Sequence, residues 1–175
     1  MKNLLLFLIL LFAATGCQSD LNTTTNDEAL VMRGQKNMVP FHAEVYQWFD
    51  LNSGFQYCGG VPIPVRFLFE GEATHMGHSR GWADGYQCSV SPEYIFHGDF
   101  AGTYIAANGD ELWFSGWVEW NLVTDTFVGS ESEFTGGTGR WVNATGSFVT
   151  TGNPTETPGV FFYIHEGEVS APGKK

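Results

Sequence analysis

The chain is short of positive charge, and it has no cluster of basic residues. Its 175 residues include 8 Lys and Arg against 19 Asp and Glu, which gives a formal net charge of −11. Binding to phosphate groups depends on clustered Lys and Arg side chains, yet the only adjacent basic residues are Lys174 and Lys175 at the end of the chain. We therefore expect no nucleic-acid partner.

Motifs for metal, nucleotide and nucleophile chemistry are also missing. Neither CxxC nor HxxxH spacing occurs, so no metal site is expected. The glycine run that begins at Gly136 lacks the spacing of a phosphate-binding P-loop, and no long helix is expected after it. No Gly-x-Ser-x-Gly elbow on a strand-to-helix turn is expected either. The sequence thus predicts no metal and no cofactor.

The amino terminus shows the three regions of a secretory signal. Lys2 precedes an apolar run over 4–14, and small residues lead to Cys17. About eleven apolar residues are too few for a membrane core that requires about twenty. The segment 14–17, Ala-Thr-Gly-Cys, resembles the bacterial lipobox, in which the cysteine becomes the lipidated first residue. This resemblance implies lipidation at Cys17 and a lipid-anchored cell-envelope protein on the outer membrane or facing the periplasm. A free periplasmic protein is the alternative.

The composition divides the chain into segments. Residues 18–36 are rich in Asn, Thr, Asp and Gln and show no apolar period, which is typical of segments that do not fold alone. We predict a signal peptide at 1–16, a disordered tether at 17–38, a β-barrel domain at 39–170 and a tail at 171–175. Cys58 and Cys88 would lie in a compartment that permits a disulfide between them; two separate buried thiols are the alternative.

Glycine and aromatic residues dominate the domain. The chain has 22 Gly, 15 Phe, 6 Trp and 6 Tyr, and no window sustains an apolar period of 3.6. Asn108 and Gly109 predict a type I′ hairpin turn. Stretches bounded by Gly, Pro, Asn or Asp predict eight strands, at 41–49, 64–76, 81–90, 94–106, 111–121, 126–134, 147–152 and 159–169. Regular short strands are typical of a closed barrel or a sandwich.

Alternation within 111–121 separates an inner face from an outer one. Phe114 and Trp120 share the apolar face, whereas Trp113 and Trp117 share the opposite face. If the two outer tryptophans are exposed, they form an aromatic stripe suited to a homo-oligomer or another protein partner. Cover from neighbouring loops or from the amino-terminal segment is the alternative.

The same alternation within 64–76 places phenylalanines inside and carboxylates outside. Phe67 and Phe69 share one face, and Glu70 and Glu72 the other. We therefore expect both glutamates to point to water and not to act as an interior acid–base pair.

Three polar residues are candidates for a binding site in the interior. His75 shares the face of Phe67 and Phe69 at the end of its predicted strand. His97 and Asp99 share a face with apolar neighbours, so alternation alone does not assign its direction. Metal binding by His75 with His78 would need the chain to turn between them, because the spacing otherwise points the rings to opposite faces.

Three segments, 70–77, 102–112 and 134–147, carry a family resemblance. The last reads Phe-Thr-Gly-Gly-Thr-Gly-Arg-Trp-Val-Asn-Ala-Thr-Gly-Ser and resembles the GGTGRFAGATG signature of bacterial proteins with the allene oxide cyclase and dirigent type of barrel. Trp141, Val142 and Asn143 replace Phe, Ala and Gly of the signature. The resemblance implies an all-β fold, an eight-stranded antiparallel closed β-barrel. Within the segment we expect Trp141 to close one end of the barrel.

The resemblance also bears on function. In plants this barrel serves as a cyclase of fatty-acid epoxides and in dirigent proteins that steer phenoxy-radical coupling. The matching segments contain turn residues and no recognisable catalytic motif, so no catalytic positions carry over to this chain.

The leading hypothesis is a membrane-anchored lipoprotein, not an enzyme, whose barrel binds an apolar small molecule or acts as an interaction module. The proposed ligand site combines His75, His97 and Asp99 with Phe67, Phe69 and Phe114, around an apolar interior. One alternative is a cyclase or isomerase that acts on a lipid-derived or aromatic intermediate. Another is a structural envelope protein, which a solidly packed interior would favour.

Overall fold

The computed structural model describes residues 37–170, 172 and 173. The predicted signal peptide, the candidate lipidation site Cys17 and nearly all of the predicted tether lie outside the described residues. In the part of the chain that is described, no helix has the length and apolar character needed to cross a membrane.

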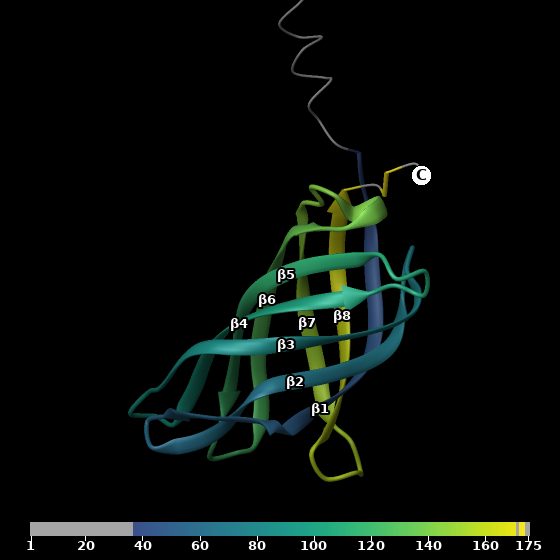
Figure 1. The fold of residues 1–175 in the computed structure, drawn as a ribbon. Helices are drawn as coiled ribbons and strands as arrows, with labels where there is room; N and C mark the ends of the chain where they lie inside the picture. Colours follow the sequence, from purple (N-terminus) through teal and green to yellow (C-terminus); the bar gives the residue numbers. More distant parts are fainter. Residues whose placement is uncertain (1–36, 171, 174–175) are drawn as a thin grey trace, which may run out of the picture. The chain divides into compact units, whose positions relative to one another are not determined.

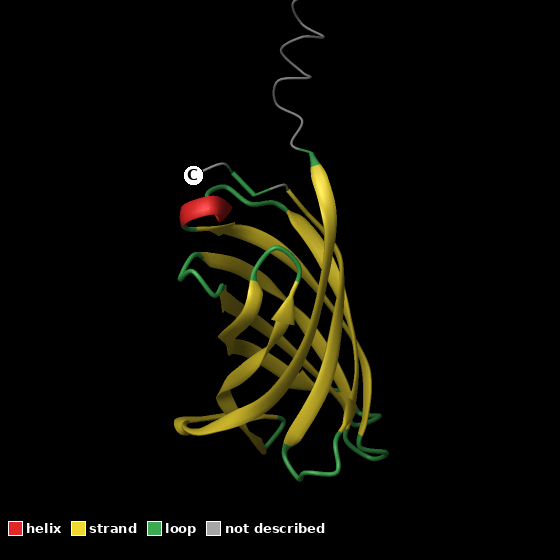
Figure 2. Ribbon diagram, turned by 90° about the vertical axis from the view of Figure 1, so that its right-hand side faces the viewer, coloured by secondary structure: helices red, strands yellow, loops and turns green. Residues whose placement is uncertain are grey.

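The described chain forms a closed β-barrel of eight strands (Figures 1 and 2). Each strand pairs antiparallel with the next along the chain, and the first pairs with the last to close the sheet. This confirms the predicted fold class and excludes the sandwich. The strands are β1 (Met38–Cys58), β2 (Val61–Ala73), β3 (Gly77–Val90), β4 (Ile95–Ile105), β5 (Glu111–Asn121), β6 (Thr126–Gly137), β7 (Gly146–Pro154) and β8 (Val160–Ser170).

Large and small inward residues alternate so that the narrow interior can be filled. Phe114 of β5 lies beside Gly102 of β4, which is its partner in the register. A Cβ atom at Gly102 would overlap the Phe114 ring and the main-chain oxygen of Trp82. A glycine is therefore required at this position for the aromatic ring to lie flat against the barrel wall.

One end of the barrel is packed solid. The short 3-10 helix η1 (Gly139–Trp141) follows β6 and lies at the end of the barrel where β1 begins (Figure 2). Trp141 is buried there in one cluster with Phe41, Tyr104 and Leu112, and its carbonyl accepts a hydrogen bond of 2.8 Å from Ala144 N–H. Trp141 thus closes one end, as expected.

Several strand boundaries differ from the predictions, and local geometry explains two of them. β1 runs far beyond residue 49, because a register shift between Asp50 and Phe55 carries it into a second paired stretch. Ser53 Oγ accepts a 2.9 Å hydrogen bond from Arg66 N–H at this irregularity. β2 ends at Ala73 and not at residue 76, since His75 turns the chain with φ of 64°.

The hairpin between β4 and β5 also differs in turn type. A type I′ turn requires positive φ at both central residues, but only Gly109 has one, at 85°. Gly109 N–H donates to Ala106 C=O at 2.8 Å, and Ala106 N–H donates to Asp110 C=O at 2.9 Å. The connection is therefore a longer loop, in which glycine alone adopts the left-handed conformation.

Cys58 and Cys88 are joined by a disulfide, with 5.4 Å between their Cα atoms. Cys58 ends β1 and is fully buried, and Cys88 lies in β3. These two strands are not hydrogen-bonded neighbours, since β2 runs between them. The bridge therefore links two strands, β1 and β3, that do not pair directly in the barrel.

Candidate functional site in the barrel interior

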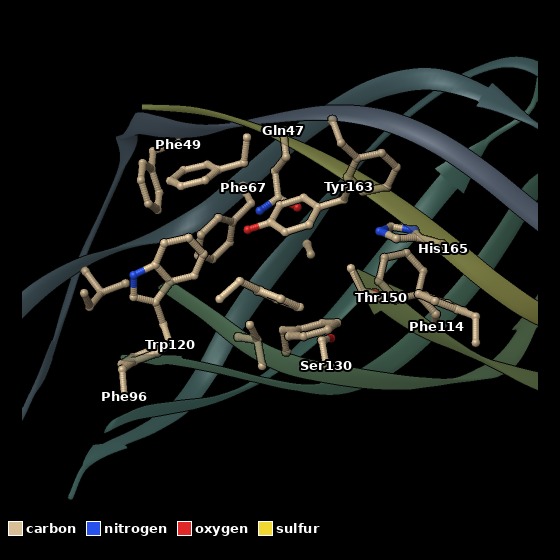
Figure 3. A pocket seen from close by; sticks show the side chains of 18 of the residues that line it. Gln47, Phe49, Phe67, Phe96, Phe114, Trp120, Ser130, Thr150, Tyr163 and His165 are labelled. Atoms are coloured by element: carbon tan, nitrogen blue, oxygen red, sulfur yellow. The ribbon is translucent and has the colours of Figure 1, made fainter. Parts of the chain in front are cut away.

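A cavity of about 290 Å³ lies inside the barrel, and Figure 3 shows side chains that line it. Leu122 and Asp125, from the turn between β5 and β6, form part of its wall. Because Asp125 is exposed and Leu122 half-buried, the cavity reaches solvent at this end. Its aromatic wall consists of Phe49, Phe67, Phe69, Phe96, Phe100, Phe114, Trp120, Phe127, Phe148, Phe161 and Tyr163.

The three phenylalanines predicted for the interior all lie in this wall. Phe69 and Phe114 are buried, and Phe67 is half-buried. The Phe69 ring meets Tyr104 at 4.7 Å between centroids and 61°, and Phe114 meets Phe148 at 5.6 Å and 69°. Such edge-to-face contacts hold aromatic rings in defined positions, so the cavity wall is preformed.

His75 does not take part in this cavity, which corrects the prediction. It lies exposed in the turn between β2 and β3. Alternation placed it inside on the assumption that the strand continued to residue 76, but the left-handed conformation of His75 ends the strand first.

His97 and Asp99 also lie outside the barrel, contrary to the prediction. Phe96 and Phe100 of β4 line the cavity, so the residues that alternate with them point outward. His97 stacks on Trp117 with 5.9 Å between ring centroids, and its Nδ1 lies 3.2 Å from Glu119 Oε1. Its Nε2 lies 3.5 Å from Asp99 Oδ1.

The outer tryptophans are partly covered. Trp113 is 39% exposed and donates its indole N–H to Glu111 Oε2 at 2.8 Å. Trp117 is half-buried beneath the His97 ring. Neighbouring side chains on the outer face, Glu111 and His97, thus contact the two tryptophans of the predicted aromatic stripe and cover part of it.

The carboxylates of β2 point outward as predicted. His78 Nε2 lies 2.8 Å from Glu70 Oε1, and its Nδ1 lies 3.2 Å from Glu72 Oε1. The hydrogen bond to Glu70, then that to Glu72, raises the pKa of His78 above its usual value. Within the described residues, no group of three or more His, Cys, Asp or Glu side chains is arranged to hold a metal ion.

The sequence around Ser79, Gly77-His78-Ser79-Arg80-Gly81, matches the Gly-x-Ser-x-Gly nucleophile motif, but its structure does not. The five residues belong to the antiparallel strand β3, and no helix follows them. Ser79 is buried, and its hydroxyl donates to Gly71 C=O at 3.5 Å. A nucleophile elbow requires an exposed serine on a strand-to-helix turn, so Ser79 does not form one.

Sequence reasoning missed a buried polar pair at the inner part of the cavity. His165 of β8 lines the cavity, and its Nδ1 is hydrogen-bonded to the hydroxyl of Tyr104, which is fully buried on β4. The imidazole also stacks on Phe148, with 4.9 Å between centroids. Alternation could have found it, since His165 shares a face with Phe161 and Tyr163 opposite the exposed glutamates of β8.

Burial determines the charge of this pair. Loss of solvation lowers the pKa of His165 to about 3 and raises the pKa of Tyr104 well above its usual value. Both side chains are therefore neutral at physiological pH. A general base works best with a pKa near the working pH, so His165 is suited to hydrogen bonding and poorly suited to proton abstraction.

Further polar side chains in the cavity wall have hydrogen-bonding atoms that are available to a ligand. Gln47, Ser130, Thr150 and Tyr163 line the cavity (Figure 3). Among the described residues, their side-chain polar atoms have no hydrogen-bond partner in the protein, and neither has Nε2 of His165. Among the described residues, Ser132 Oγ is the only fully buried side-chain nitrogen or oxygen atom that lacks a hydrogen-bond partner. The polar groups of the wall are thus open to the cavity.

Comparison with known proteins finds matches among solved structures. No protein-family model matches the chain, and no curated protein matches it. The solved structures that match include that of a pterocarpan synthase dirigent protein, which is 12% identical. The alignment covers 81% of this chain and 96% of that one, with a TM-score of 0.39.

Proposed function

We propose that the barrel binds an uncharged, mainly apolar small molecule in its interior. The observation that carries this proposal is the open cavity of about 290 Å³ with a preformed aromatic wall. Small-molecule sites are concave, apolar and supplied with a few polar groups that orient the ligand. A solidly packed interior would instead have favoured a structural envelope protein.

The volume indicates the size of the ligand. An engineered cavity of about 150 Å³ lined by apolar side chains binds benzene. The cavity here is about twice that size, at 290 Å³, so it suits a molecule of about two fused rings.

The electrostatics favour binding over catalysis. A cyclase or isomerase that moves a proton needs an acid or base that titrates near the working pH. Burial instead lowers the pKa of His165 and raises the pKa values of Tyr104 and Tyr163. Asp125, the one acidic residue that the described chain contributes to the wall, is exposed and accepts the Trp120 indole N–H at 3.0 Å.

A pair of matched substitutions tests the proposal. Val118 lines the cavity, whereas Val128 is 53% exposed on β6. Val118→Phe should fill part of the cavity and weaken naphthalene binding by about fivefold to a hundredfold, because added bulk costs about 1–3 kcal/mol. Val128→Phe should leave binding unchanged.

Binding is measured from the Trp120 indole signal in ¹H–¹⁵N spectra during a naphthalene titration. Native mass spectrometry of protein purified from its own host would identify a retained ligand. Absence of naphthalene binding, or equal binding by the wild type and Val118→Phe, would contradict the proposal.

The membrane anchor is a separate proposal from the sequence. We infer from the lipobox resemblance that lipidation of Cys17 holds the barrel at a membrane of the cell envelope. The apolar segment before Cys17 and its small residues support this, and two or more acyl chains hold a protein stably at a bilayer.

A further inference from the structure

Three polar side chains form one row across the inner wall of the cavity. Ser130 of β6 pairs in register with Thr150 of β7, and Thr150 pairs with His165 of β8. Directly opposed residues on neighbouring antiparallel strands have Cβ atoms about 5 Å apart. We call these three residues the polar row; the other strands contribute mainly aromatic and aliphatic side chains to the wall.

The Tyr104 contact decides which nitrogen of His165 carries the proton. The Tyr104 hydroxyl is fully buried, and among the described residues His165 Nδ1 is its only hydrogen-bond partner. If Nδ1 carried the proton, the phenolic hydrogen would have no acceptor, and a buried unpaired donor costs about 1–3 kcal/mol. The favoured arrangement therefore has Tyr104 donating to Nδ1 while Nε2 carries the proton.

This arrangement leaves a fixed donor in an apolar space. Nε2–H has no hydrogen-bond partner in the part of the chain that the structure describes. His165 lines the cavity with its ring held between Tyr104 and Phe148, and Figure 3 shows the imidazole at the cavity wall. Thr150 pairs with His165 and Ser130 pairs with Thr150, and both hydroxyls can also donate a hydrogen bond. Among the described residues, no Lys or Arg lines the cavity, so no described side chain there neutralises an anionic ligand.

We propose that the polar row recognises a hydrogen-bond acceptor, so that the ligand is a neutral ring system with a carbonyl or ether oxygen bound toward His165. This inference rests on the proposed binding function and specifies its ligand class and orientation. A charged carboxylate would lose its hydration without gaining a counter-charge, and a pure hydrocarbon would leave the Nε2–H donor unpaired.

Two naphthalene derivatives of similar size separate this inference from the proposed function. 2-Acetylnaphthalene carries a carbonyl acceptor, whereas 2-ethylnaphthalene does not. Both are titrated into the wild type and into the double variant Tyr104→Phe/His165→Phe, which removes both hydrogen-bond partners and keeps apolar rings in their places. Replacing both partners in this way is close to neutral for folding. His78→Phe, the same substitution at an exposed histidine, is the control.

The measured quantity is the affinity for the acetyl probe divided by that for the ethyl probe. We expect this ratio to fall about fivefold to tenfold in the double variant, the effect of one buried hydrogen bond, and to stay unchanged in His78→Phe. Retained binding of 2-ethylnaphthalene shows that the variant cavity is intact. An unchanged ratio in the double variant would overturn the inference and leave the proposed function standing. If neither probe binds the wild type, the inference and the proposed function are both refuted.

A second measurement needs no variant. In ¹⁵N spectra of the wild-type histidines, the His165 Nε2 should be protonated and Nδ1 should not. The Nε2 signal should move when 2-acetylnaphthalene is added and stay nearly still with 2-ethylnaphthalene at equal occupancy. A proton on Nδ1, or equal movement with both probes, would refute the assignment of the donor.

Discussion

Acid should destabilise the barrel through His165 in particular. Burial lowers the pKa of this imidazole from 6.5 to about 3, so the unfolded chain binds a proton at this site throughout the range between those values while the folded chain does not. Because the unfolded state then holds more protons, the free energy of unfolding falls as pH decreases below 6.5. Above pH 6.5 the site contributes nothing to the pH dependence.

The size of the effect follows from the proton count. Each pH unit in this range costs about 1.4 kcal/mol per additional proton bound by the unfolded chain. Lowering the pH from 7 to 4.5 should thus remove about 2–3 kcal/mol of stability through His165 alone. The titratable residues in contact with the imidazole, Tyr104 and Tyr163, have pKa values raised by burial, so they stay neutral over this range.

The assay compares urea unfolding at pH 7 and pH 4.5 for the wild type and for Tyr104→Phe/His165→Phe. Other groups titrate in both proteins, so the difference between the two pH dependences isolates the pair. The wild type should lose about 2–3 kcal/mol more than the double variant. Parallel losses in the two proteins would refute the assignment of a buried, neutral His165.

Two further predictions concern the cysteines. The Cys58–Cys88 bridge closes a loop with a sequence separation of 30, so Cys58→Ala/Cys88→Ala should lower the free energy of unfolding by about 3–4 kcal/mol, measured by urea unfolding against the oxidised wild type; an unchanged midpoint would contradict this. Cys17→Ala should move the protein from the membrane pellet to the soluble fraction of its host, and continued sedimentation with membranes would count against lipidation.

Local alternation explains which side chains share a face. In β5, Phe114 and Trp120 are predicted to share a face, and both line the cavity. The same reasoning places Glu70 and Glu72 of β2 outside, and both are paired with the exposed His78. These predictions succeed because successive side chains on an extended backbone point to opposite sides.

Alternation fails where it does not reveal which face turns inward. In β4 the outer face carries Ile95 and Ala101 beside His97 and Asp99, so hydropathy alone gives no direction. The barrel shows that the face with Phe96 and Phe100 turns inward. The Phe100 ring packs against Phe114 of β5, with 6.1 Å between the ring centroids. His75 fails for another reason, since its own positive φ ends the strand before the alternation reaches it.

The amino-acid sequence by itself determined the strand content and the aromatic character of the interior, because these depend on local alternation and on turn residues. The strand pattern left a closed barrel and a sandwich open, and the eight-stranded closed barrel was implied by the family resemblance of the glycine-rich segment. Only the tertiary structure decided that Tyr104 and His165, separated by 61 residues, share a hydrogen bond in the interior. It also brought Ser130 and Thr150 into one row with His165. Such contacts depend on strand register and on closure of the sheet between β1 and β8, which no local pattern encodes.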